Sequence, residues 1–271
     1  MSDTLLKVEG LTRYFDVSKP WLNRVIEREE KQFLTATADV SFEIRRGETF
    51  ALVGESGSGK STIAKMIVGL LEPSEGKITF DGQEMNFASG AAMRTLRRRF
   101  QMIFQDPMSS LNPRRRVGGI IAGPLRLHGF GDIDARVDRA LDQVGLARAF
   151  RNRYPHELSG GQRQRVGIAR AIALEPEFIL ADEIVSGLDV SSQAQVLNLL
   201  EALVRDLGLT LAFISHDLSV IRRLCTSVMV LHQGRIVEQA PTARIFAEPT
   251  AAYTRELLDA IPLPDPDQVW V

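Results

Sequence analysis

One segment of this chain has the residue types and spacing of a phosphate-binding loop. Residues 54–62 read Gly-Glu-Ser-Gly-Ser-Gly-Lys-Ser-Thr and match the pattern of glycine, four residues and Gly-Lys-Ser/Thr without a mismatch. Glycines let backbone N–H groups turn inward around phosphate oxygens, and the helix expected to start near Lys60 adds its positive dipole end. The pattern predicts a nucleotide site made by Gly54, Glu55, Ser56, Gly57, Ser58, Gly59, Lys60, Ser61 and Thr62. Lys60 would neutralise the β- and γ-phosphates, and the Ser61 hydroxyl would ligate Mg²⁺.

A pair of carboxylates follows the apolar run 178–181. Asp182 is placed to hold Mg²⁺, directly or through water, and Glu183 to orient and deprotonate an attacking water. Successive strand residues point to opposite faces, so the two carboxylates need not compete for one role. An isolated Asp-Glu pair is more often a solvated strand end. The phosphate loop favours the functional interpretation, because it needs a metal partner on a neighbouring strand.

A second candidate anion site lies at residues 158–162, Leu-Ser-Gly-Gly-Gln, at the start of a predicted helix. Ser159 suits the N-cap, and a helix N-terminus with two glycines attracts anions. The chain already has one phosphate loop. Two half-sites on one monomer make sense if they serve different nucleotides. The residues concerned are Ser159, Gly160, Gly161 and Gln162.

Short apolar runs predict the strands that position these groups. The runs 49–53, 178–181 and 211–214 are rich in β formers and end in polar or Gly-rich clusters, which is typical of buried parallel strands. Each delivers its functional residues at its C-terminal end, where ligands bind in open α/β sheets. Alternating apolar residues in 6–11 and 38–44 predict half-exposed antiparallel strands, hence an N-terminal β layer.

The remaining segments complete an α/β organisation without an internal repeat, so residues 1–271 are predicted to form one domain. Residues 107–157 have helical patterning and little strand signal, which predicts an inserted helical subdomain. Residues 227–239 suit a hairpin turning at Gln233-Gly234, followed by a helix near 253–260 and a tail at 262–271. The polar stretch 16–34, with Trp21, is expected to be a surface excursion.

Composition excludes several classes of protein. The 33 basic and 34 acidic residues give a net charge of −1, so we expect no nucleic-acid partner. The single cysteine excludes a disulfide framework, and no uncharged stretch approaches the ~20 residues of a membrane span. If the protein works at a membrane, another chain is expected to hold it there. The basic triplets 97–99 and 114–116 are interpreted as solvated faces rather than phosphate or lipid contacts.

In this order, the phosphate loop, the Leu-Ser-Gly-Gly-Gln segment and the Asp-Glu pair resemble the ATP-binding cassette (ABC) ATPases. The resemblance implies ATP and Mg²⁺ as cofactors and a P-loop NTPase core with a mainly parallel sheet. It implies that two cassettes pair head to tail, each signature helix capping the ATP on the other's phosphate loop. By the same resemblance Gln105 is the Q-loop residue that reaches Mg²⁺ or the water, and His216 is the switch histidine.

The resemblance extends to two further positions. Residues 186–189, Ser-Gly-Leu-Asp, resemble the D-loop that crosses the dimer interface and add Asp189 to the site. Phe15 aligns with the aromatic that stacks on the base, with Tyr14 as the alternative. A stacking aromatic contributes ~1 to 3 kcal/mol by analogy with nucleic-acid bases. Core packing is an alternative role for this ring.

A finer resemblance is to the ATP-binding subunits of bacterial dipeptide and oligopeptide importers. It implies a partner ATPase, two membrane permeases, a periplasmic or surface-anchored binding protein, and a peripheral position on the cytoplasmic face of the inner membrane. Peptides are the expected cargo, with nickel, opines or sugars as alternatives. The segments that carry this resemblance are 53–62, 101–107, 109–113, 154–157, 189–197, 214–220 and 253–258.

Departures from the family pattern keep other functions open. Ile184 stands where Pro is usual and Gly187 where Ala is usual, which leaves open a change in turnover or coupling while every catalytic side chain is retained. A binding-only cassette beside a catalytic partner remains an alternative, against which the retained Glu183 and His216 argue. Ala251-Ala252 replaces a common His-Pro pair before Tyr253. A soluble ABC protein of DNA repair or translation is disfavoured, because the chain has neither a long coiled-coil insert nor a second cassette.

Overall fold

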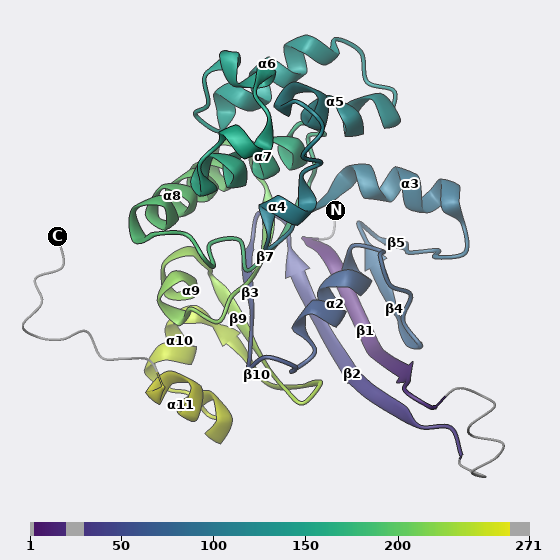
Figure 1. Cartoon of the computed structure of the whole chain (residues 1–271). Helices are drawn as coiled ribbons and strands as arrows, with labels where there is room; N and C mark the ends of the chain where they lie inside the picture. The colour runs from purple at the N-terminus through teal and green to yellow at the C-terminus, as the bar shows by residue number, and fades with distance from the viewer. Residues whose placement is uncertain (1–2, 20–29, 261–271) are drawn as a thin grey trace, which may run out of the picture.

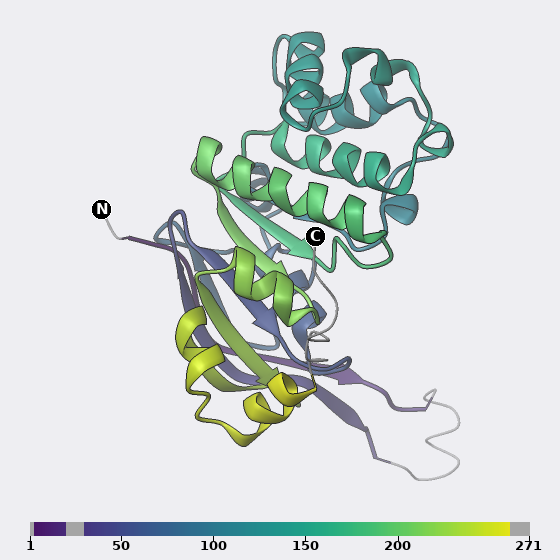
Figure 2. The ribbon, with the colours of Figure 1, turned by 90° about the vertical axis from the view of Figure 1, so that its left-hand side faces the viewer.

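Two β-sheets and a helical region make up the computed structural model, which describes residues 3–19 and 30–260 (Figure 1). The helices of residues 107–172 gather at one end of the molecule, above the sheets in both views (Figure 2). Of the predicted excursion 16–34, residues 20–29 lie outside the described residues, as does the predicted tail 262–271. The bounds of the excursion were too wide, because Asp16 belongs to the first strand of the antiparallel sheet and residues 33–34 to the strand paired with it.

The N-terminal sheet is antiparallel, with strand order β2-β1-β4-β5. Its strands are β1 (Thr4–Asp16), β2 (Phe33–Arg45), β4 (Glu75–Phe80) and β5 (Gln83–Glu84). Val8, Val40 and Phe42 are buried between more exposed neighbours, as the period-two pattern predicts, whereas Leu6 lies next to the equally buried Leu5. β1 and β2 extend beyond the alternating segments because their pairing continues to Asp16 and Phe33.

The second sheet has the order β10-β9-β3-β8-β7-β6, and all its neighbouring strands except β9 and β10 are parallel. Its strands are β3 (Thr49–Val53), β6 (Phe100–Ile103), β7 (Phe178–Asp182), β8 (Thr210–Ile214), β9 (Ser227–His232) and β10 (Arg235–Pro241). The three predicted parallel strands and the hairpin are confirmed. Gln233 and Gly234, with φ of 47° and 77°, make the hairpin turn. The sequence did not predict β6, whose four residues directly follow a basic helix.

Helices cover both faces of the parallel sheet. Successive β3 residues alternate between two cores: Ala51 and Val53 pack with the helical region, and Phe50 and Leu52 with the antiparallel sheet. The predicted helical insert, residues 107–157, contains helices and no strand, and its core continues into α7. Together with the parallel sheet, these helices confirm the α/β fold prediction. The helices are α2 (Lys60–Ile67), α3 (Gly90–Arg99), α4 (Pro107–Ser110), α5 (Val117–Leu127), α6 (Ile133–Gln143), α7 (Gly160–Ile172), α8 (Val190–Leu207), α9 (Leu218–Leu224), α10 (Thr242–Ala247) and α11 (Ala252–Asp259), with 3₁₀ turns at Arg148–Asn152 and Pro155–Glu157.

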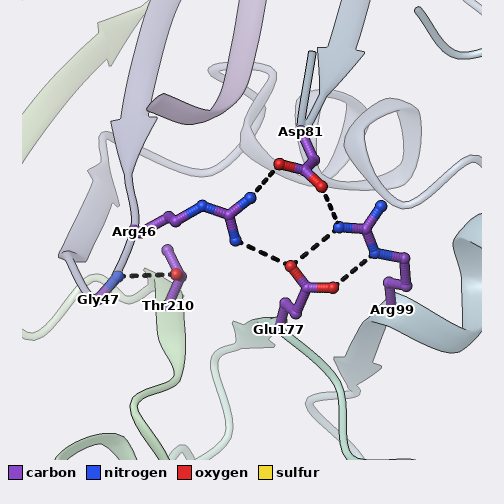
Figure 3. Close-up of polar contacts among 6 residues, drawn as sticks. All are labelled: Arg46, Gly47, Asp81, Arg99, Glu177 and Thr210. Carbon is purple, nitrogen blue, oxygen red and sulfur yellow. Dashed lines mark hydrogen bonds and ion pairs between the residues drawn. The ribbon is translucent and has the colours of Figure 1, made fainter. Parts of the chain in front are cut away.

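A ring of four charges ties the two sheets together at the amino end of β7 (Figure 3). Glu177 accepts from Arg46 at 2.9 Å and from Arg99 at 2.6 Å, and both guanidinium groups also bind Asp81. The two carboxylates hold the pKa of Arg99 above its ordinary value, chiefly through the hydrogen bond that Arg99 donates to Glu177. Every charge in this ring is therefore neutralised within the chain.

The three arginines of the basic triplet 97–99 all contact other parts of the chain. Arg97 donates to the carbonyl of Gly69 at 2.6 Å, and the Arg98 guanidinium lies 4.4 Å from the centre of the Phe130 ring. Together with Arg99 in the charge ring, each member of the triplet has a partner inside the chain. The triplet is thus more than the solvated face that the sequence predicts.

Candidate functional site

The predicted phosphate-loop residues, Gln105, Asp182, Glu183 and His216 lie at the carboxyl ends of four parallel strands. Residues 54–59 follow β3, Gln105 follows β6 after one residue, Asp182 ends β7, and His216 follows β8. Beside these strand ends lies a cavity of about 530 Å³. Its lining consists of Phe15, Leu34, Thr35, Ala36, Ser56, Gly57, Gly59, Lys60, Ser61, Thr62, Gln105, Asp182 and Glu183. The fold therefore places the candidate residues of the phosphate loop and the two candidate carboxylates around one cavity.

Lys60 lies at the bottom of the loop and is 6 % exposed. Its ammonium group donates to the carbonyl oxygens of Gly54 and Glu55, both at 2.7 Å. Burial lowers the pKa of Lys60, and the negative charges of Glu183 and Asp182 oppose that shift. An anion in the cavity would supply the full negative partner that two neutral carbonyls do not.

The loop needs glycine where the rest of the fold presses against it. Gly59 has a φ of 103°, and a Cβ there would lie 2.5 Å from the carbonyl oxygen of Ala36 in β2. Three residues of the motif, Gly54, Glu55 and Ser58, do not line the cavity. They form the outer side of the loop, where Ser58 accepts a hydrogen bond from the backbone of Gly234 at 2.9 Å.

Asp182 and Glu183 put two carboxylates next to each other at the end of β7. Burial raises the pKa of Asp182, the charge of Glu183 raises it further, and Lys60 opposes both. Ser61, Asp182 and Gln105 all line the cavity, and their oxygen atoms are the ligands that Mg²⁺ prefers. The described residues hold no group of three or more His, Cys, Asp or Glu side chains able to bind a metal alone. A magnesium ion here would take its remaining ligands from phosphate or water oxygens.

Glu183 is the meeting point of two further candidates. Its carboxylate accepts from Gln105 Nε2 at 2.9 Å and lies 3.4 Å from Nδ1 of His216. The His216 side chain is 68 % exposed, so a ligand can reach it. The backbone of Glu183 has a φ of 47°, an uncommon value for a residue other than glycine. Ser186 stabilises this turn by donating both its N–H and its hydroxyl to the carbonyl of Glu183, at 3.1 and 2.9 Å.

Two of the departures from the family pattern, Ile184 and Gly187, lie close to Glu183 in the chain. Ile184 is 1 % exposed and packs in the core of the helical region. Gly187 has a φ of 76°, a left-handed conformation that glycine adopts without strain. Ile184 thus contributes packing directly beside Glu183, and glycine suits the turn at 187.

Residues 159–162 start α7 and do not line the phosphate-loop cavity. The Ser159 hydroxyl accepts from the N–H of Gln162 at 3.3 Å, and the Gln162 side chain accepts from the N–H of Ser159 at 3.0 Å. This reciprocal capping confirms Ser159 as the N-cap. Gly160 borders a different cavity, which Gln105 and residues 186–188 also line. Asp189 caps α8 by accepting from Ser192 at 2.9 Å and lines neither cavity.

Phe15 is half-buried and lines the phosphate-loop cavity, whereas Tyr14 does not. The Arg13 guanidinium lies 5.0 Å from the centre of the Phe15 ring. On the paired strand, Leu34 lies opposite Phe15 and is 57 % exposed. Sequence reasoning missed residues 34–36 of the lining. The register of β1 against β2 would have found them, because it places Leu34 beside Phe15.

The sequence profile of the ABC transporter family matches residues 37–186, which include the phosphate loop, the segment 158–162 and the Asp182-Glu183 pair. The chain belongs to the ABC transporter family. The family resemblance predicted from the motifs is therefore confirmed, and ABC ATPases bind ATP or ADP. No helix within residues 3–19 and 30–260 is both long and apolar enough to cross a bilayer.

Relatives of this ABC protein include named importer components. A Brucella ovis protein with the provisional name of peptide import ATP-binding protein is 50 % identical over 98 % of this chain and 82 % of its own length. A Bacillus subtilis protein, YkfD, with the provisional name of oligopeptide transport ATP-binding protein, is 46 % identical over 97 % of this chain and 78 % of its own. The dimeric ATP-binding cassette MJ0796, in a post-hydrolysis state with ADP and Pi, has a TM-score of 0.76 and 27 % identity, over 88 % of this chain and 99 % of that one.

Proposed function

We propose that this ABC protein binds ATP with Mg²⁺ and hydrolyses it to drive import through partner permeases, with peptides as the cargo. The observation that carries the hydrolytic part is the convergence of Gln105 and His216 on Glu183, at the rim of the phosphate-loop cavity. A carboxylate with two polar neighbours and access to solvent is suited to orient a water and accept its proton. Membership of the ABC family supports nucleotide as the ligand.

The loop residues would bind and orient the phosphates. The N–H groups of residues 57–62 and the Lys60 ammonium would neutralise phosphate charge, and Phe15 would stack on the base. Ser61 and Asp182 would hold Mg²⁺, which offsets the negative charge that builds up at the phosphates during hydrolysis. Glu183 would take the proton of the attacking water, while His216 and Gln105 hold that water and the terminal phosphate in place.

The segment 159–162 would serve the nucleotide of a second ATPase subunit. Two observations support this: the segment lies outside the cavity of its own phosphate loop, and the dimeric cassette MJ0796 shares this fold. An exposed helix N-terminus with two glycines can accept a terminal phosphate offered by a partner. Asp189 and Gly187 would lie at the same dimer contact. Each ATP would then bridge two subunits and be hydrolysed between them.

Peptide import is the finer part of the proposal and rests on the two relatives named as peptide and oligopeptide transport proteins, at 50 % and 46 % identity over nearly the whole chain. It places this chain on the cytoplasmic face of a bacterial inner membrane, beside a partner ATPase, two permeases and a periplasmic or surface binding protein. The segment after Gln105, which includes the exposed Met108, would help to receive the permease.

Release of phosphate from ATP tests the hydrolytic proposal. The purified chain, or its complex with the partner ATPase, should release phosphate with Mg²⁺ present and stop when the metal is chelated. Release that proceeds equally without divalent metal contradicts the assigned role of Asp182. Binding of ATP without any release, in the complex as well as alone, would instead identify a binding-only cassette.

Cargo is tested in the assembled importer. The subunits that co-purify with this chain are reconstituted in vesicles with their binding protein, and ATP hydrolysis is measured with dipeptides, oligopeptides, Ni²⁺ or sugars. We expect stimulation by peptides. Stimulation by nickel or a sugar and none by peptides would contradict the cargo while leaving the ATPase assignment intact.

A further inference from the structure

The C-terminal helix α11 touches the phosphate loop from outside the cavity. The backbone N–H of Glu55 donates a hydrogen bond to the hydroxyl oxygen of Tyr253, in the first turn of α11, at 3.1 Å. The two residues are 198 positions apart in the chain. Tyr253 does not line the cavity, so this contact is not part of the ligand-binding surface.

The contacted peptide unit is also the one that holds Lys60. The N–H of Glu55 and the carbonyl of Gly54 belong to the same planar trans peptide and point in opposite directions. On its outer side this peptide donates to Tyr253 at 3.1 Å, and on its inner side it accepts from the Lys60 ammonium at 2.7 Å. A rotation of the peptide would break both hydrogen bonds. Each bond also polarises the peptide in the sense that strengthens the other.

Tyr253 is itself held firmly from two sides. Its ring centre lies 3.9 Å from that of His232, the last residue of β9, which precedes the turn that binds the loop through Gly234. Just before α11, the backbone N–H groups of Thr250 and Ala251 donate to the carboxylate of Glu238 at 2.8 and 3.0 Å. Glu238 is 8 % exposed. Burial opposes its ionisation, but these N–H donors together with hydroxyl donors such as Thr250 outweigh burial and hold the pKa of Glu238 at about 2.

We propose that Tyr253 is a positioning residue of the ATP site, which fixes the Gly54–Glu55 peptide so that its carbonyl holds Lys60 facing the phosphates. The inference builds on the proposed function, since it concerns the same nucleotide. It assigns the C-terminal helix a role in ATP affinity, exerted through the backbone of the loop. Tyr253 acts as a neutral hydroxyl, because burial raises its pKa above the ordinary value of a tyrosine.

Tyr253→Phe tests the proposal, since it removes the hydroxyl and keeps the ring on His232. Tyr154→Phe is the matched control: it deletes the same hydroxyl from a tyrosine whose ring also lies against a histidine, His156, with ring centres 5.5 Å apart. In the nucleotide-free full-length chain, we expect amide hydrogen exchange at Glu55 to be faster in Tyr253→Phe and unchanged in Tyr154→Phe. By calorimetry, we expect the Kd for ATP to rise about 3- to 10-fold in Tyr253→Phe alone, as for one lost hydrogen bond.

The readouts separate positioning from a general loss of stability. In the hydrolytic assembly we expect the KM for ATP to rise by a similar factor in Tyr253→Phe, with kcat within about 2-fold of the wild type. A lower unfolding temperature with unchanged Glu55 exchange and unchanged ATP affinity would overturn the proposal. So would equal effects of Tyr253→Phe and Tyr154→Phe. A wild-type chain that failed to bind ATP would contradict the proposed function. Hydrogen exchange needs no nucleotide, so the exchange at Glu55 would still show whether Tyr253 fixes the Gly54–Glu55 peptide.

Discussion

The two ends of strand β7 carry similar residues in opposite electrostatic situations. Directly before the strand, Glu177 binds Arg46 and Arg99, and all four charges of that ring are paired (Figure 3). At the other end, Asp182 and Glu183 have each other's negative charge as neighbours, and Lys60 donates to two carbonyl oxygens and the Ser58 hydroxyl, all of them neutral. The difference shows which end is built for stability and which is built for a ligand. Paired charges need nothing further, whereas unpaired charges of like sign need a cation or a phosphate from outside the chain.

The largest contrast is expected in catalysis. Glu183→Gln should lower the rate of ATP hydrolysis by roughly 10²- to 10⁴-fold, because the amide keeps the shape but cannot accept the proton of the water. It should also trap an ATP-bound dimer, visible by light scattering. Glu177→Gln is the matched control at the other end of the strand and should leave the rate within about 2-fold. Wild-type turnover in Glu183→Gln would contradict the assignment of Glu183 as the general base.

In folding stability the contrast should be reversed. Arg99→Met removes a guanidinium that binds both Glu177 and Asp81, so we expect the free energy of unfolding to fall by about 1 to 2 kcal/mol, a discounted value for partly exposed pairs in a network. Glu183→Gln should change it by less than about 0.5 kcal/mol. Urea denaturation of the nucleotide-free chains measures both. An Arg99→Met protein as stable as the wild type would show that the ring does not tie the sheets together.

Removing one carboxylate from the ligand end should stabilise the empty protein. Asp182→Asn relieves repulsion by Glu183 and the cost of burying a charge, so we expect the unfolding free energy to rise by about 0.5 to 1 kcal/mol. The same variant should lose the Mg²⁺ dependence of ATP hydrolysis together with most of the activity. Thermal unfolding and a Mg²⁺ titration check the two parts. A destabilised Asp182→Asn would mean that the carboxylate already has a sufficient partner in the empty chain.

The smallest expected effect is on the pH dependence of folding stability, to which Glu177 and Asp182 should contribute with opposite signs. The pKa of Glu177 is lowered, chiefly by its hydrogen bond from Arg99, so its contribution to stability is present above its ordinary pKa and is lost as pH falls. The pKa of Asp182 is raised, chiefly by burial, so acidification favours its folded form and stability is lost as pH rises through the folded pKa. As the pH falls through and below the ordinary glutamate pKa of 4.5, the difference in unfolding free energy between wild type and Glu177→Gln should therefore shrink. The excess unfolding free energy of Asp182→Asn over wild type should shrink as well, because protonation of Asp182 removes its repulsion by Glu183. On acidification the wild type thus loses stability at the Glu177 end of β7 and gains stability at the Asp182 end. Urea titrations at several pH values measure both contributions to the unfolding free energy. This prediction would be refuted if acidification changed the contributions of Glu177 and Asp182 in the same direction.

The comparison also explains what the sequence could predict. The ligand end follows from local patterns, because β3, β7 and β8 are apolar runs and their functional residues come directly after them. The charge ring joins residues 131 and 78 positions apart, and no local pattern marks them. The same holds for Tyr253, whose partner is 198 positions away. Strand β6 was missed because four residues are too few to show a period, and residues 34–36 because their role depends on the register of β1 and β2.

The central claim is that each chain holds ATP with its own phosphate loop and lends residues 159–162 to another subunit. Binding of ATP to the isolated chain, measured by calorimetry at concentrations where it is monomeric, tests this most directly with two variants. We expect Lys60→Met to weaken binding at least about 10-fold, because it removes the cation that meets the phosphates. Ser159→Arg should bind ATP within about 2-fold of the wild type and lose hydrolysis only in the dimer. Equal loss of ATP binding by the isolated chain in both variants would contradict the claim, since it would show that the segment serves its own chain's nucleotide.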